Sequence, residues 1–447
     1  MRKLLMAGVA LGAVSALVSA RPALAQQAPA PDAAAVFPIT TETDLAGVNG
    51  PSLNGAAPGS VQVNLGARMY GAMWFQSNPS GTPSTAVVNG KTVSTGNAYK
   101  EAQPQLESWF QLYPGFDYAS PSGVHFGAQA SLWMTQNGET NNSNNSGVGV
   151  ATPAPFFHDA FGYVSSAQYG KFWFGTPNGA LTSTAVGTGD DFGTGMFFSW
   201  YSTNPYVPWA MGDAYDNYGA TEKLMYSTPT FSGFSGAISW TPTAVGLNWG
   251  DGAMQAQLPG SSGLNSQNRV EIAGKYDGTV GIVGLKVDAG YVFANAEKAG
   301  VTTVGQNVSF GNFGLQVNVA GFEFEGSVNT GQFNYAIADD NGNDPLGPLP
   351  VGAKGTTAFV LGAGYGAGPF KVGAVYYGVQ YDEMDMGAAT SAIGHVSGEG
   401  LGGSYTVGPG VVAYLDFITA SVDGNGGTGP AGKQHPTGLG LGTFFTW

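Results

Sequence analysis

The chain has 447 residues, no cysteine and a formal net charge of −14, and only 10% of its residues are charged. The absence of cysteine excludes disulfides and thiolate chemistry, and the acidic balance argues against nucleic acid as a partner. Soluble domains carry about a quarter charged residues, so this chain has too few charges for a surface that is covered by water everywhere.

The first 25 residues have the order of a secretory signal peptide. Arg2 and Lys3 form a basic start, residues 4–18 are apolar, and Ala23-Leu24-Ala25 is typical of a cleavage site. The apolar run is short for a membrane-spanning helix, which needs about 20 residues. We therefore expect 1–25 to be a signal peptide. Residues 26–59 are rich in Ala, Pro and Gly without a sustained period, and we expect a flexible periplasmic segment there.

From residue 60 onward, apolar and polar residues alternate. Val61, Val63 and Leu65 fall on one face and Gln62 and Asn64 on the other, which is the period of a strand with one apolar and one polar face. Sixteen stretches of this kind are predicted, at 60–77, 104–118, 123–135, 155–166, 170–178, 218–229, 233–242, 267–277, 281–294, 305–319, 321–332, 355–366, 369–382, 395–407, 410–420 and 436–447.

The connectors between these stretches alternate in length. Tight turns are expected near 120–123, 169–170, 232–233, 278–279, 366–368 and 408–409, and long polar loops include 136–154, 179–217, 243–266 and 333–354. A membrane protein without spanning helices must close its sheet, because hydrocarbon offers no partner to an open edge. We therefore predict an all-β fold, a transmembrane antiparallel β-barrel of about 16 strands over 60–447, with short periplasmic turns and long extracellular loops.

Three stretches resemble the general porins of Gram-negative bacteria, of the alphaproteobacterial type. They are residues 158–164 with 169–175, residues 224–229 with 231–234, and the C-terminal strand that ends at Trp447. The resemblance covers 60–447. It implies a bacterial outer-membrane channel that is a homotrimer in contact with lipid and lipopolysaccharide. It also places Phe445 and Trp447 where the barrel-assembly machinery reads its signal.

The same resemblance implies that the loop after the fifth strand, 179–217, folds into the barrel and narrows it. Asp190 and Asp191 lie in this loop. The side chains expected along the lumen include Arg68, Lys223, Lys286, Glu323 and Glu325. The family usually sets several arginines opposite the loop, whereas only Arg68 and Arg269 follow residue 25 here. From the loop acids and the acidic net charge we expect a mild preference for cations.

No motif in the sequence indicates an enzyme or a resident cofactor. Gly398-x-Gly400-x-x-Gly403 matches a dinucleotide fingerprint as text, but it lies within a period-two run. The four histidines have no metal-ligand spacing, and no G-x-S-x-G elbow occurs. A Ser and a His on separate strands remain the basis of an alternative outer-membrane lipase. Residues 339–344 are dense in carboxylate and amide oxygens, so a solvated loop tip and a loosely bound divalent cation are both open there.

Passive diffusion of ions and small hydrophilic solutes is the function that the sequence favours. Trp109, Tyr113 and Trp133 are phased inward, and they support an alternative channel that is specific for a solute such as a sugar. A barrel whose loops bind a partner or a surface, without an open pore, is the other alternative.

Overall fold

The computed structural model describes residues 57–77, 85–88, 91–94, 104–135, 156–187, 222–243, 266–296, 298–299, 302–303, 307–332, 355–382, 393–425, 431–435 and 437–446. All of them belong to the second of two units, Ile39–Trp447, and the first unit is Met1–Pro38. The predicted signal peptide and nearly all of segment 26–59 lie outside the described residues. Among the helices of the described part, none is long and apolar enough to cross a membrane.

The described strands build one closed antiparallel barrel. In order around it they are β1 (Val61–Ser77), β4 (Gln105–Ala119), β5 (Val124–Thr135), β6 (Phe156–Ser166), β7 (Gly170–Gly175), β8 (Lys223–Ser227), β9 (Phe234–Thr243), β10 (Ser266–Val280), β11 (Val283–Ala296), β14 (Val308–Val319), β15 (Phe322–Gln332), β16 (Gly355–Ala367), β17 (Phe370–Asp382), β18 (Ile393–Gly408), β19 (Val411–Asn425) and β21 (Thr437–Thr446). The predicted antiparallel barrel of sixteen strands is confirmed for the described part of the chain.

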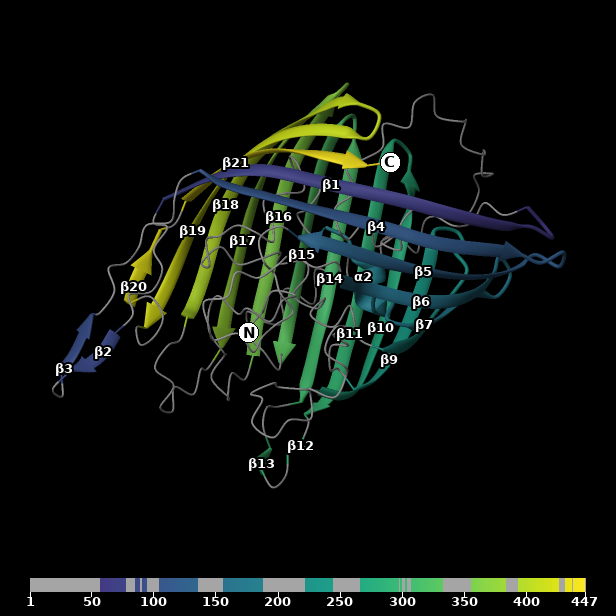
Figure 1. The fold of residues 1–447 in the computed structure, drawn as a ribbon, viewed down its shortest axis with the longest axis horizontal. Coiled ribbons are helices and arrows are strands. Elements are labelled where there is room, and N and C mark those ends of the chain that lie inside the picture. Colours follow the sequence, from purple (N-terminus) through teal and green to yellow (C-terminus); the bar gives the residue numbers. More distant parts are fainter. Residues whose placement is uncertain are drawn as a thin grey trace. The chain divides into compact units, whose positions relative to one another are not determined.

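The first strand closes the barrel. β1 pairs with β4 along one edge, with Arg68 opposite Gln111, and with β21 along the other, with Arg68 opposite Thr446. Figure 1 shows β1 in purple lying between β4 and the yellow β21. Because both edges of β1 are paired, no backbone edge is left open at this seam, as hydrocarbon surroundings require.

Five shorter strands lie outside this count. β20 (Ala431–Gln434) pairs with the end of β19, and β2 (Thr85–Val88) and β3 (Lys91–Ser94) form a separate hairpin. β12 (Lys298–Ala299) and β13 (Thr302–Thr303) form another. The helix α2 (Ala180–Thr184) follows β7 directly.

Two of the predicted tight turns were placed too early, the first by three residues and the second by one. β10 continues through Gly278 and Thr279 to Val280, which pairs with Val283 across Gly281 and Ile282. Likewise, β18 ends at Gly408 and the turn contains Gly410. Gly281 and Gly410 have φ values of 65° and 70°. Two-residue hairpins need such positive φ angles, so the turn forms at these glycines and the strand continues up to them.

The two faces of the barrel wall differ in the way that the alternating sequence predicts. Exposed apolar side chains such as Val63, Phe324 and Leu401 point outward. The residues next to them along the strand point inward, as Glu325 does beside Phe324. The buried Asp117 faces inward on β4. An apolar belt outside and polar groups inside are what a barrel needs in a bilayer.

Several inward tyrosines lie over glycines of the next strand. A Cβ on Gly127 would collide with the ring and hydroxyl of Tyr163, and one on Gly398 would collide with Tyr377. Gly398 belongs to the G-x-G-x-x-G stretch, which lies inside β18. The glycines of this stretch therefore belong to a strand of the barrel wall, as the alternating pattern predicts, and one of them makes room for an aromatic ring.

Candidate pore lining

The chain turns onto the inner face of the wall after β7. The backbone N–H of Ala180 donates to Ser239 Oγ at 3.1 Å, and that of Leu181 to Glu271 Oε2 at 3.1 Å. Val186 N–H donates to Asp288 Oδ1 at 3.0 Å. Ser239, Glu271 and Asp288 lie on β9, β10 and β11, and all three are almost fully buried. Segment 179–187 therefore runs across the inside of three neighbouring strands.

Glycines in the wall give this segment room to approach. A Cβ on Gly290 would lie 2.9 Å from Leu181 Cδ1, and one on Gly314 would collide with Val186 O and with Asp288 Oδ1. Gly187 has a φ of 71° and lies against the carbonyl oxygens of Leu315 and Gly326. The segment thus reaches from β9 as far as β14 and β15.

An apolar cluster on the inner face of the wall packs against α2. Leu181 packs with buried side chains from several strands, namely Phe161, Tyr163, Trp173, Met225, Val292 and Phe310. Burying apolar surface is favourable by about 25 cal/mol per Å², so this cluster and the hydrogen bonds from Ala180 and Leu181 hold the same short helix. Part of the inner wall is therefore apolar, where alternation alone predicts polar groups.

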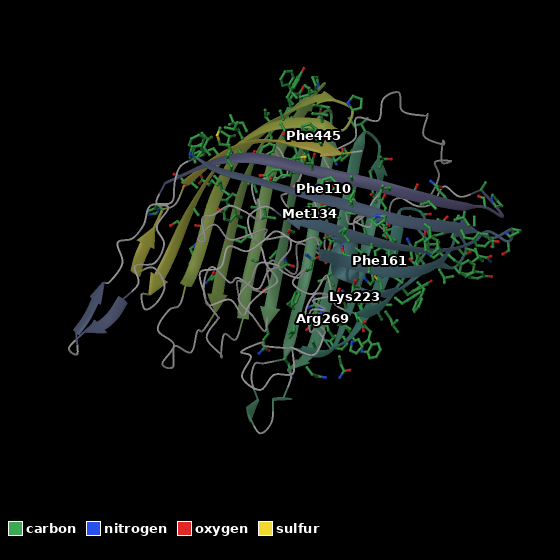
Figure 2. The ribbon with its side chains drawn as sticks, viewed as in Figure 1. Phe110, Met134, Phe161, Lys223, Arg269 and Phe445 are labelled. Carbon is green, nitrogen blue, oxygen red and sulfur yellow. The ribbon has the colours of Figure 1, made fainter. Side chains whose placement is uncertain are left out.

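Charged side chains lie beside this helix. Lys223 Nζ donates to the carbonyl of Pro177 at 2.8 Å, and Arg269 Nε is 2.6 Å from Glu271 Oε1. Lys223 and Arg269 are labelled on β8 and β10 in Figure 2. Lys223, which was predicted to line the lumen, is on the inner face and also fixes the chain just before α2.

The other predicted lining residues for which the structure gives side-chain positions also face inward. The Arg68 guanidinium lies 5.1 Å from the Phe444 ring centroid, within cation–π range. Glu323 accepts from Gln316 Nε2 at 2.6 Å and lies 3.4 Å from Lys371 Nζ. Glu325 is buried, and Lys286 lies two residues before Asp288 on the same face of β11. These positions leave the role of each side chain in transport as a prediction.

Several predicted site residues lie outside the described part of the chain. They are Asp190, Asp191, the terminal Trp447 and the oxygen-rich loop 339–344. Phe445 lies on β21, half exposed on the outer face, and pairs with Met69 of β1 and Val411 of β19. Its role as an assembly signal stays a prediction.

Sequence reasoning missed two anchors of segment 179–187. Glu271 and Ser239 were not singled out, because neither residue matches a motif. The spacing Arg269-x-Glu271 predicts the ion pair between these two residues, since residues two apart on a strand share a face. It does not predict that Glu271 also accepts from the N–H of Leu181, which is 90 residues away in sequence.

Aromatic side chains gather on the inner face where the barrel closes. Tyr70 and Tyr414 are stacked with ring centroids 6.1 Å apart, and Phe444 lies 5.2 Å from Tyr70. Tyr113, one of three predicted inward aromatics, is buried on this face and donates to Gln111. The side chains of the other two, Trp109 and Trp133, are outside the described set.

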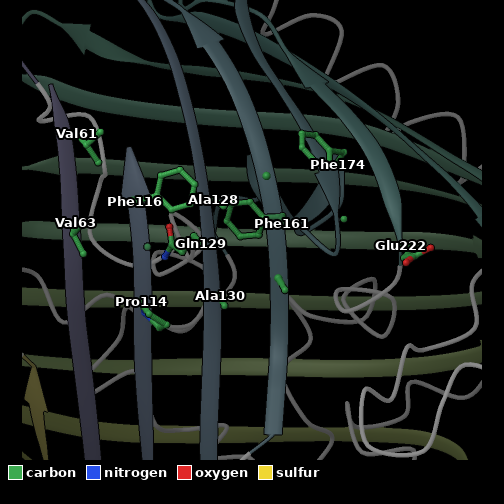
Figure 3. A pocket seen from close by; sticks show the side chains of 14 residues that line it. Val61, Val63, Pro114, Phe116, Ala128, Gln129, Ala130, Phe161, Phe174 and Glu222 are labelled. Atoms are coloured by element: carbon green, nitrogen blue, oxygen red, sulfur yellow. The ribbon is translucent and has the colours of Figure 1, made fainter. Parts of the chain in front are cut away.

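The outer face carries an apolar depression of about 800 Å³. Its floor is made of small residues on β5 and β6, namely Ala128, Ala130, Ala160 and Gly162, and Figure 3 shows Phe116 and Phe174 at its sides with Val61 and Val63 beyond. Within the described residues, His, Asp and Glu form no group of three or more that could hold a metal ion.

Comparison with known proteins gives a family and a fold. The sequence model of the Gram-negative porin family matches residues 13–427. The outer-membrane channel DcaP of Acinetobacter baumannii superposes with a TM-score of 0.52 at 10% identity, covering 88% of this chain and 99% of that one. An anion-selective porin from Comamonas acidovorans gives 0.50 at 14% identity, covering 87% and 100%.

OmpT of Vibrio cholerae, in a trimer form, also gives a TM-score of 0.50, at 12% identity and with 87% and 100% of the two chains covered. At these identities the likeness establishes the fold alone. No protein of the curated set matches the sequence significantly.

Proposed function

Because the chain belongs to the Gram-negative porin family of outer-membrane β-barrel channels, we propose that it forms an open, water-filled pore for passive diffusion of ions and small hydrophilic solutes. The observation that carries the proposal is the closed barrel with an apolar outer face and charged and amide side chains on its inner face. A lumen with such a lining needs no catalytic residue to pass polar solutes.

The pore is narrowed, in this proposal, by the loop 179–217. Its support is the described start of the loop, which is bound to the inner wall through Ser239, Glu271 and Asp288. Asp190 and Asp191 are the third and fourth residues after Gly187. Charges beside a narrow lumen are weakly screened, so these two aspartates are proposed to give a mild cation preference.

The experiment is conductance of the purified protein in a planar bilayer, with the reversal potential measured under a salt gradient. We expect discrete open channels that prefer cations, and a shift toward anions in the double variant Asp190→Asn, Asp191→Asn. The variant Glu399→Gln, which removes an exposed carboxylate from the outer face of β18, serves as the control. Absence of conductance contradicts the pore, whereas anion preference of the wild type contradicts only the selectivity.

A solute-specific channel is the second candidate, and the inward aromatic side chains favour it. Tyr70, Tyr113, Tyr414 and Phe444 place aromatic rings on the inner face, and rings of this kind stack on sugars. Conductance that saturates as a sugar is added supports this candidate, whereas unsaturated conductance supports general diffusion.

We also propose that the protein is a homotrimer surrounded by outer-membrane lipid and lipopolysaccharide and inserted by the barrel-assembly machinery. A trimer form is stated for the similar Vibrio cholerae protein. The apolar depression on β1 and β4–β7 offers a surface that a second copy can cover.

A further inference from the structure

A second polar cluster lies on the inner face at the tight-turn end of β4–β7, and it shares Tyr163 with the apolar cluster that packs against α2. Nδ1 of His125 and Oδ2 of Asp117 are 2.7 Å apart, and the Tyr163 hydroxyl donates to Asp117 Oδ1 at 2.7 Å. Asp117 is fully buried, whereas the His125 side chain is 25% exposed. An ionised carboxylate only accepts hydrogen bonds, so His125 donates to Asp117 through Nδ1.

Lys171 completes the cluster from β7. Its Nζ lies 4.0 Å from the Tyr163 ring centroid and 4.8 Å from that of Trp173, so the two rings position the ammonium group. Lys171 also interacts electrostatically with Asp117. Gly127 allows this arrangement, because a Cβ there would collide with the Tyr163 ring that reaches across to Asp117.

Strand register brings three hydrogen-bond donors into one row. His125 pairs with Ser165, and Ser165 pairs with Lys171. Adjacent strands are about 4.8 Å apart, so an imidazole, a hydroxyl and an ammonium group lie on three successive strands with their side chains on the inner face. Asp117, Tyr163 and Trp173 lie in the next row and hold the outer two donors from behind.

We propose that His125, Ser165 and Lys171 form a binding subsite for a small oxyanion, a carboxylate or phosphate group of a passing solute, at the tight-turn end of the pore. The proposal rests on the open pore proposed above.

Sulfate is the probe, because it is a small oxyanion. Its effect on single-channel conductance is measured over a range of sulfate concentrations, and we expect the effect to saturate. Lys171→Gln should raise the half-saturating concentration about tenfold, since it removes a charged donor. His125→Gln should also raise it, because it removes the imidazole that Asp117 positions.

The matched control is Lys371→Gln. Like Lys171, Lys371 is the second residue of its strand, but it lies on β17 beside Glu323. This variant removes the same charge from the lumen and should leave the sulfate effect unchanged. An equal loss in both lysine variants would show a general effect of lumen charge and would overturn the subsite, as would conductance that does not respond to sulfate.

A binding measurement separates failure of the subsite from failure of the pore. Titration calorimetry of sulfate into the detergent-solubilised wild type and Lys171→Gln needs no conductance. Heat of binding that the variant loses supports the subsite even in a closed barrel. Identical titrations of the two proteins contradict it whether or not the protein conducts.

Discussion

At the scale of single residues, the barrel wall depends on glycines that accommodate rings from neighbouring strands. Gly127 is the clearest case. An added Cβ would meet the end of the Tyr163 ring, and that ring is buried with its hydroxyl bound to Asp117. The ring cannot move aside without breaking this hydrogen bond, so the methyl group and the bond exclude each other.

We expect Gly127→Ala to lower the free energy of unfolding by about 1.5–3 kcal/mol, the cost of a lost hydrogen bond to a charged group. The control is Gly71→Ala on β1, where nothing lies within 4 Å of an added Cβ. Replacing that glycine should be neutral or slightly stabilising, because the unfolded chain loses freedom. Urea unfolding in lipid vesicles measures both, and equal stabilities for the two variants would contradict the role given to Gly127.

At the scale of elements, segment 179–187 is held at two points that differ in chemistry. Its helix rests on apolar side chains around Leu181 and on Glu271, whereas its end depends on one carboxylate, Asp288, that accepts from Val186. The end should therefore be the part that a single substitution releases.

Asp288→Ala removes the acceptor, whereas Asp288→Asn keeps an oxygen in the same place. We expect the Val186 amide to exchange its hydrogen up to about tenfold faster in the alanine variant and near the wild-type rate in the asparagine variant, because a hydrogen bond stabilises by about 0.5–1.5 kcal/mol. Site-resolved hydrogen exchange tests this. Unchanged exchange in Asp288→Ala would show that the apolar cluster alone holds the segment.

The strands could be predicted from the sequence because their signal is local. Adjacent residues are enough to recognise the alternation at Val61, Val63 and Leu65 and the turns at glycines. The sixteen strands predicted in this way match the described barrel. The errors were local too: the turn glycine is Gly281, three residues after the glycine chosen.

The anchors of the loop could not be predicted in this way. Glu271 and Asp288 bind backbone N–H groups 90 and 102 residues away, and backbone donors leave no trace in side-chain patterns. The inward cluster around Leu181 also violates the alternation rule, since apolar residues such as Val292 and Phe310 occupy inner positions. Leu181 of the docked segment packs in this cluster and helps to keep water away from these side chains.

At the scale of the whole molecule, the outer face is not uniform. Most of it exposes bulky apolar side chains, but the depression on β4–β7 has a floor of alanine and glycine between Phe116 and Phe174. β7 and β8, with 6 and 5 residues, are also the shortest strands of the described barrel. A depression beside these short strands can hold side chains of a second copy, whereas a smooth apolar belt is suited to lipid.

We therefore expect Ala128→Trp, which fills this depression, to convert the proposed trimer into monomers, because overpacking a close contact is destabilising by about 1–3 kcal/mol at each site. The matched control is Ala374→Trp, since Ala374 is also an outward alanine but lies exposed on β17. Mass measurement by light scattering in detergent reports the oligomeric state, and heat-modified migration of the barrel confirms that both variants are folded. A folded Ala128→Trp trimer would show that lipid, and not a second copy, fills the depression, whereas dissociation of both variants would show that the tryptophan acts without regard to its place.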